Sequence, residues 1–149
     1  MKLKEELYKQ CVAFVTKKQN TIEATIASHQ KSLESETKSS AGDKHETGRA
    51  MLQLEMEKAS QQLIVAQQMK ETLHKINLSE SKTKVRLGSL VVTNNATYFM
   101  SISVGRLVVD SKEYFAISIA SPIGKILLGQ QVDSELVFNG NKILIKEIT

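Results

Sequence analysis

The chain has 149 residues, of which 41% are hydrophobic, and a formal net charge of +4 at pH 7. This length allows one domain or two small ones with an ordinary core. Basic residues are interspersed with acidic ones instead of forming a stripe, so nothing signals direct nucleic-acid binding. The single cysteine, Cys11, excludes a disulfide framework, and its simplest role is that of a small apolar residue in a helix seam.

The N-terminus carries charged residues where a signal peptide needs an apolar run, among them Lys2, Lys4 and Glu5. No stretch approaches the ~20 apolar residues that a membrane-spanning helix needs. We therefore expect a cytoplasmic protein without a membrane partner.

Two long helices are predicted in the first half of the chain. Apolar residues recur there at spacings of three and four, which is typical of one helix face. In the first helix they are Leu7, Cys11, Phe14, Ile22, Ile26 and Leu33, and in the second they are Leu52, Met56, Ala59, Leu63, Ala66, Leu73 and Ile76. The second series reads as a heptad repeat, so we expect the two helices to form a coiled coil.

The register of this coiled coil follows from the residue numbers, because partners in an antiparallel hairpin have numbers with a constant sum. Three pairs add to 85: Leu33 with Leu52, Ile26 with Ala59, and Ile22 with Leu63. This sum predicts a turn between Gly42 and Asp43, inside a polar, glycine-containing break at residues 39–48. We predict a hairpin arm over residues 1–78, on the order of 50 Å long at about 1.5 Å per residue.

The second half of the chain, residues 79–149, predicts a small β domain. After a polar link at 77–84, short β-branched and aromatic runs occupy 85–92, 96–104, 107–109, 114–119, 135–138 and 142–148. Asn139-Gly140 between the last two runs indicates a tight hairpin. Ser121 as N-cap, Pro122 at the first helical position and Gly129 after the last turn predict one short helix. The fold class is therefore α+β, with a mostly antiparallel sheet after the helical hairpin.

Three segments resemble the bacterial Gre transcript-cleavage factors. Residues 42–46 (GDKHE) resemble the Gly-Asp-x-x-Glu tip of that family, and residues 87–91 (LGSLV) resemble its Phe-Gly-Ser-x-Val strand. Residues 121–129 (SPIGKILLG) are similar to its Ser-Pro-x-Gly-x-Ala-Leu-Leu-Gly segment, which is the most specific of the three matches. The segments follow one another in the family's order and cover the layout of nearly the whole chain.

The resemblance implies a transcription elongation factor with an FKBP-like C-terminal domain that docks on RNA polymerase. The arm would enter the secondary channel of the polymerase, where Asp43 and Glu46 would help to hold a catalytic magnesium ion and its water. Backtracked RNA would be cut there by the polymerase active site. The docking domain would include a polymerase-binding segment made of Ser121, Pro122, Ile123 and Gly124.

By this resemblance the protein is not an enzyme in itself but a cofactor of the endonuclease activity of RNA polymerase. Magnesium would be shared only in the polymerase complex, and the free protein, expected to be a monomer, would need no cofactor. Contact with the nascent RNA 3′ end would be indirect. The chemistry is reasonable, because magnesium accepts one or two protein carboxylates together with waters, and such an ion activates water.

Two other interpretations of the chain stay open. The family tip continues Asn-Ala-Glu-Tyr, whereas this chain continues Thr47-Gly48-Arg49-Ala50, which favours a channel-binding regulator without cleavage activity. Asp43 and Glu46 also have the spacing of a capping box for the second helix. With that structural role alone, the chain would be a general coiled-coil interaction protein.

Overall fold

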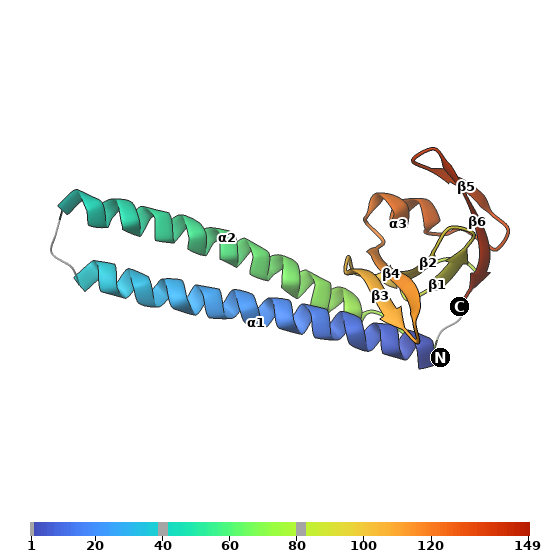
Figure 1. Cartoon of the computed structure of the whole chain (residues 1–149), viewed down its shortest axis with the longest axis horizontal. Coiled ribbons are helices and arrows are strands. Elements are labelled where there is room, and N and C mark those ends of the chain that lie inside the picture. The colour runs from blue at the N-terminus through green and yellow to red at the C-terminus, as the bar shows by residue number, and fades with distance from the viewer. Residues whose placement is uncertain (1, 39–41, 80–82) are drawn as a thin grey trace. The chain divides into compact units, whose positions relative to one another are not determined.

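The computed structural model describes residues 2–38, 42–79 and 83–149, with side chains over the same ranges except 36–38 and 42–46. Two long helices come first, followed by a six-stranded, mostly antiparallel sheet, with one short helix between its fourth and fifth strands in the chain (Figure 1). The predicted α+β fold class is thus confirmed. In chain order the elements are α1 (Lys2–Lys38), α2 (Gly42–His74), β1 (Leu90–Thr93), β2 (Thr97–Ser101), β3 (Gly105–Val109), β4 (Lys112–Ser118), α3 (Pro122–Leu127), β5 (Glu135–Phe138) and β6 (Asn141–Ile148).

The chain divides into two compact units. The base unit contains Met1–Phe14 and Lys70–Thr149, and the hairpin unit contains Val15–Met69. Both long helices contribute to both units, so the first turns of α1 and the last turn of α2 belong with the sheet. The predicted boundary between residues 78 and 79, where the sequence pattern changes, stays a prediction.

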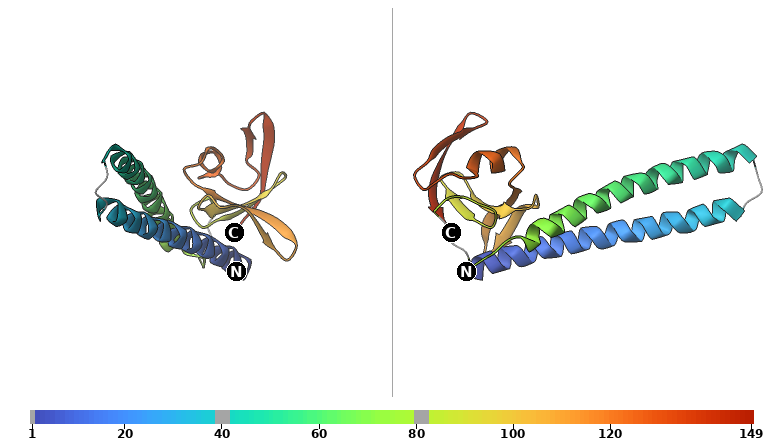
Figure 2. Two further views of the ribbon diagram at one scale, coloured as in Figure 1. Left: turned by 60° about the vertical axis from the view of Figure 1, so that its left-hand side comes forward. Right: turned by 180° about the vertical axis from the view of Figure 1, so that it is seen from behind.

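In the hairpin unit α1 and α2 run antiparallel, side by side (Figure 2). Their shared core contains the buried residues Ile22, Ala59 and Ala66, with Ile26 and Leu63 packed against them. This cluster unites the predicted pairs Ile22 with Leu63 and Ile26 with Ala59. The predicted register is therefore consistent with the packing around these five side chains.

The predicted position of the turn is wrong by a few residues. Because α1 ends at Lys38 and α2 begins at Gly42, residues 42–48 are helical and do not belong to a loop. The acids in this stretch explain the early start, since negative charge in the first turns of a helix is stabilised by the helix dipole. The connecting residues 39–41 lie outside the described residues.

The sheet has the strand order β3-β4-β2-β1-β6-β5. Strands β2 and β4 pair in parallel, which the sequence pattern did not predict, and every other pair of neighbours is antiparallel. The predicted strand at 85–92 begins only at Leu90. Val85 instead exchanges hydrogen bonds with Gln130 and Gly129, and the chain then turns at Gly88, which has a φ of 93°.

The core of the base unit lies between the sheet and α3. Its fully buried members include Val91, Met100, Leu127 and Ile145, and Val85 completes the cluster. The first turns of α1 also bury side chains in this unit. Leu7 and Cys11 are fully buried, and the Cys11 Sγ lies 3.7 Å from the Ser101 Oγ on β2. The expected burial of Cys11 is confirmed, although its hydrogen-bonding neighbour is a sheet residue.

Two tight turns close hairpins at the two edges of the sheet. Asn139 and Gly140 have φ angles of 51° and 78°, so the predicted Asn-Gly hairpin between β5 and β6 is confirmed. Asp110 and Ser111, between β3 and β4, have φ angles of 50° and 65°. Such left-handed backbone favours glycine and asparagine, so Ser111 holds a conformation that stores strain.

Candidate functional site

The first group of candidate residues, Asp43 and Glu46, lies at the start of α2. The backbone places them at the second and fifth positions of the helix. Positions three apart in a helix lie on the same face, so the backbone brings positions 43 and 46 to one face of α2. Asp43 is inside the helix and not before it, so it does not occupy the N-cap position of a capping box.

The side chains of these two acids lie outside the described residues, and so does that of His45. Among the side chains that the structure does describe, no group of three or more His, Cys, Asp or Glu residues could hold a metal ion. The magnesium role of these acids stays a prediction.

The second group, Ser121 to Gly124, forms the beginning of α3. Ser121 is the N-cap, and its hydroxyl accepts a hydrogen bond from the Gly124 N–H at 3.1 Å. The same hydroxyl donates to the Ser118 carbonyl at 2.6 Å. Pro122 occupies the first turn, where its missing N–H is no loss. Ser121 therefore fixes the strand β4 to the helix α3.

Gly124 is required here by close approach and not by its backbone angles. A Cβ added to Gly124 would lie 2.0 Å from the Ser118 carbonyl oxygen and 2.9 Å from the Ser121 Oγ. No side chain fits in that space without moving backbone. The Ser-Pro-x-Gly pattern thus has a local structural cause, namely a helix start pressed against the end of β4.

This geometry separates the candidate segment into structural and available residues. Gly124 is buried and Ser121 is engaged in the cap, while Ile123 packs partly buried against the core. Pro122 and Lys125 are exposed. The sequence does not point to Lys125, because a lysine in a short helix has no distinguishing pattern, and only the burial of its neighbours singles it out.

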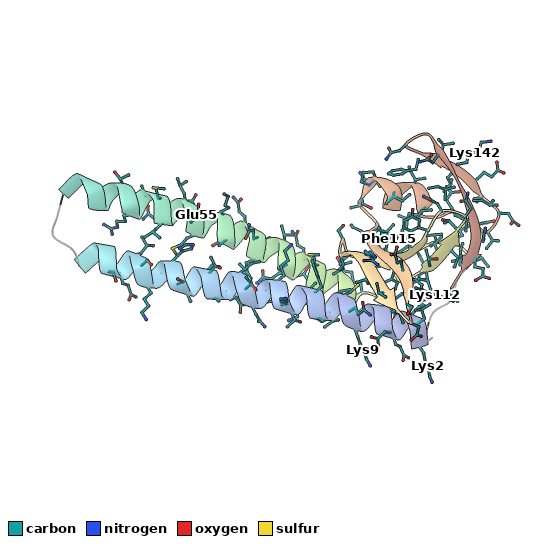
Figure 3. The ribbon with its side chains drawn as sticks, viewed as in Figure 1. Lys2, Lys9, Glu55, Lys112, Phe115 and Lys142 are labelled. Carbon is teal, nitrogen blue, oxygen red and sulfur yellow. The ribbon has the colours of Figure 1, made fainter. Side chains whose placement is uncertain are left out.

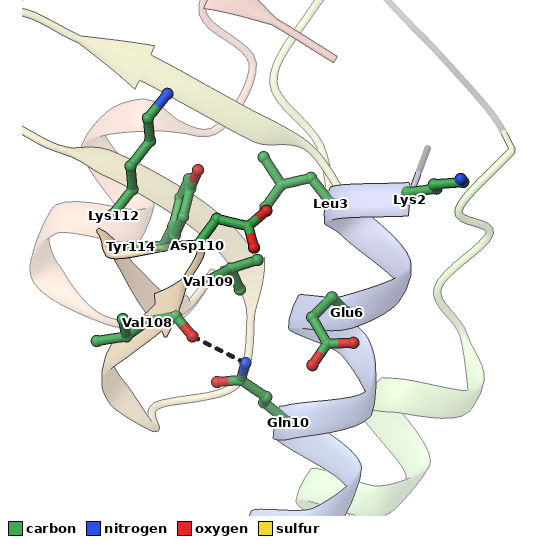
Figure 4. Close-up of a pocket in the computed structure, with 9 residues that line it drawn as sticks. All are labelled: Lys2, Leu3, Glu6, Gln10, Val108, Val109, Asp110, Lys112 and Tyr114. Atoms are coloured by element: carbon green, nitrogen blue, oxygen red, sulfur yellow. Dashed lines mark hydrogen bonds between the residues drawn. The ribbon is translucent and has the colours of Figure 1, made fainter.

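A cleft of about 610 Å³ lies elsewhere in the base unit, between the first turns of α1 and the β3–β4 hairpin. Figure 4 shows Glu6 and Asp110 reaching toward this space from the helix and from the turn, and Gln10 donating to the Val108 carbonyl at 3.0 Å. Its lining comes from two segments a hundred residues apart, so no sequence motif could indicate it. The residues that line it are Lys2, Leu3, Glu6, Gln10, Val108, Val109, Asp110, Lys112 and Tyr114.

Lys4, next to this cleft in sequence, is a buried charged residue. Its side chain is 3% exposed, and its Nζ donates to the Thr149 carbonyl at 3.3 Å. Burial, and to a lesser degree the neighbouring Arg86 guanidinium, lower the pKa of the Lys4 ammonium. The contact ties the first turn of α1 to the end of β6, because Thr149 directly follows that strand and exchanges backbone hydrogen bonds with Leu90 of β1. Its role is structural.

No helix in the part of the chain that the structure describes is long and apolar enough to cross a membrane. The sequence matches no family model. It also matches no curated protein. One similar solved structure is that of the transcription factor Gfh1, with 18% identity over 95% of this chain and 92% of that one, and a TM-score of 0.35. A likeness at this level adds no evidence on function, and the fold class rests on the helices and strands described above.

Proposed function

We propose that this chain is a transcription factor of the Gre type, which binds RNA polymerase and presents Asp43 and Glu46 to the polymerase active site. The observation that supports this most is the position of the two acids. They lie three positions apart in the first two turns of α2, a spacing that puts two positions on one face of a helix. Carboxylates held at a helix end can be offered to a second macromolecule without a pocket of their own.

The donor chemistry fits a magnesium ion that is shared with a partner. Magnesium is usually bound by one or two protein carboxylates, and waters and phosphate oxygens complete its coordination. When bound, the ion supplies an activated water and stabilises developing negative charge on oxygen. Asp43 and Glu46 would contribute oxygen ligands and negative charge, and the remaining ligands would come from the polymerase and the RNA.

The segment at the start of α3 is the proposed contact with the polymerase. Because Ser121 and Gly124 are used by the fold, we assign the contact itself to the exposed side chains of Pro122 and Lys125. Substitutions at these two positions can weaken polymerase binding without changing the core. Substitutions at the other two positions would change the fold as well.

The test of this assignment is binding to the organism's own purified RNA polymerase. Lys125→Glu should weaken binding by about tenfold, because reversing a contacting charge adds repulsion at the interface. The matched control is Lys142→Glu on β6, an exposed lysine of the same unit that is labelled in Figure 3. If the parent protein does not bind the polymerase at all, the proposed function is wrong. If both variants bind like the parent, the assignment of the contact to α3 is wrong.

A second candidate function is regulation of the polymerase without RNA cleavage. The residues after the acids favour it, because Arg49 and Ala50 are exposed on α2 where the family has an acid and an aromatic residue. An arginine close to carboxylates competes with a metal ion for their charge. The two functions differ in one readout: a halted, backtracked complex with magnesium yields short 3′ RNA fragments if the chain stimulates cleavage, and none if it binds without cutting.

A further inference from the structure

The hairpin unit is packed unevenly along its length. We call residues 15–26 and 59–69 its proximal part, and residues 27–35 and 47–58 its distal part. The proximal part contains the buried residues Val15, Ile22, Ala59 and Ala66, all at most 6% exposed. Among the described side chains of the distal part, none is buried.

The seam of the distal part is formed by half-buried side chains. Leu33 and Leu52, a pair predicted by the register, are both half-buried, and so are His29 and Met56, which the same register places level with each other. An imidazole opposite a methionine buries less apolar surface than two aliphatic side chains do. The distal seam therefore combines one aliphatic pair with one weak pair.

Apolar side chains of the distal part also lie outside the seam. Met51 and Leu54 are each 64% exposed, so most of their surface contributes nothing to the stability of the isolated hairpin. Long helices in water depend mainly on tertiary packing for their stability. Without buried seam residues, the distal helices have little to resist local opening.

We propose that the hairpin has two stabilities, and that its distal part opens locally while the proximal part stays folded. The distal part would then be ordered fully only when a partner encloses it. Part of the binding free energy would be used for this ordering, so the net affinity would be lower and the complex would dissociate readily. The identity of that partner rests on the proposed function, whereas the two stabilities of the free protein do not.

The test is native-state hydrogen exchange of the free, full-length chain, followed by mass spectrometry of peptides. Amides of the distal part should exchange at least tenfold faster than amides of the proximal part, after correction for intrinsic rates. A difference smaller than tenfold would show one cooperative hairpin and overturn the proposal. Because no polymerase is present, this result is independent of whether the proposed function is correct.

A seam variant tests the cause of the difference. His29→Leu places an aliphatic side chain opposite Met56 and should slow distal exchange by about tenfold, with the proximal part changed by less than threefold. The matched control is Gln30→Leu, the same new side chain one position away on an exposed face, which should leave distal exchange unchanged. Equal slowing in both parts, no slowing by His29→Leu, or equal slowing by the control would each overturn the assigned cause.

Discussion

The base unit and the hairpin unit use the same two helices with very different packing. In the base unit α1 buries Leu7 and Cys11 completely against a sheet whose own core includes Phe99 at 0% exposure. In the hairpin unit the same helix continues with Ile22 as its last buried residue among the described side chains. The first turns of α1 thus belong to a core built from several elements, whereas its later turns share a seam with α2 alone.

This difference shows what each unit is suited to do. Two helices that share one seam bury few side chains, so a hairpin cannot be as stable as a sheet covered by helices. It can, however, hold the start of α2 at a position many residues away in sequence from the core of the base unit. The base unit supplies stability, and the hairpin unit supplies the first turns of α2.

The largest expected effect compares one core residue from each unit. Phe99→Ala should lower the free energy of unfolding by about 3–5 kcal/mol, because it leaves a cavity in a fully buried site. Leu52→Ala, at a half-buried position of the hairpin, should lower it by about 1 kcal/mol. Denaturant unfolding followed by circular dichroism measures both. Equal losses would contradict the comparison.

The start of α3 gives a sharper test within the base unit. Gly124→Ala should destabilise the protein by about 2–3 kcal/mol, because the new methyl group would overlap the Ser118 carbonyl oxygen. Lys125→Ala, at the next and exposed position, is the control and should change stability by less than about 0.5 kcal/mol. Thermal unfolding of the parent and of both variants at one pH measures the two changes in stability. A Gly124→Ala protein as stable as the parent would show that the approach of α3 to β4 can relax freely.

Alkaline pH should weaken the contact between α1 and the sheet. Burial raises the pKa of the Cys11 thiol, an effect partly opposed by its hydrogen bond with Ser101. A folded-state pKa above the unfolded value of about 9.0 favours the protonated thiol in the fold, so its contribution is fully present below that pH and declines above it. The free energy of unfolding should therefore fall more steeply above pH 9 in the parent than in Cys11→Ala. Parallel curves would exclude a role for this thiol.

The smallest expected effect is a gain in stability at the β3–β4 turn. Ser111 has a φ of 65°, so Ser111→Gly should relieve strain and stabilise the protein by about 0.5–1 kcal/mol. The turn between β5 and β6 already has Gly140 at the second central position, so Gly140→Ser is the reverse experiment and should destabilise by a similar amount. Paired melting curves would show opposite shifts. Shifts of the same sign would rule out backbone strain as the cause.

The sequence pattern was sufficient for the elements that local rules control. The α3 helix, Pro122–Leu127, has the predicted N-cap and proline, and the β5 strand has the predicted bounds of residues 135–138. These features depend on residues close in the chain, where capping and turn chemistry act directly. The hairpin pairs were predictable for a related reason, since a heptad seam repeats its signal many times.

Other features could not be read from local patterns. The parallel pairing of β2 with β4 depends on how β3 reverses the chain, and the hydrogen bond between Gln10 and Val108 joins residues 98 positions apart. The sequence pattern misplaces the start of α2 because the polar, glycine-containing stretch 39–48 is typical of a loop, whereas the helix includes both Gly42 and Gly48. A glycine weakens a helix by roughly 1 kcal/mol but does not end it.

Under the proposed function Asp43 and Glu46 help to hold a magnesium ion in the polymerase active site, and RNA cleavage in a halted, backtracked complex with magnesium tests this claim most directly. Asp43→Ser and Glu46→Gln should each reduce the rate of 3′ fragment release by about tenfold or more, since each removes a charged ligand of the ion. Glu55→Gln, an exposed acid further along α2 that Figure 3 labels, should cleave like the parent. All three variants should keep their binding to the polymerase. Cleavage by Asp43→Ser at the parent's rate would contradict the claim.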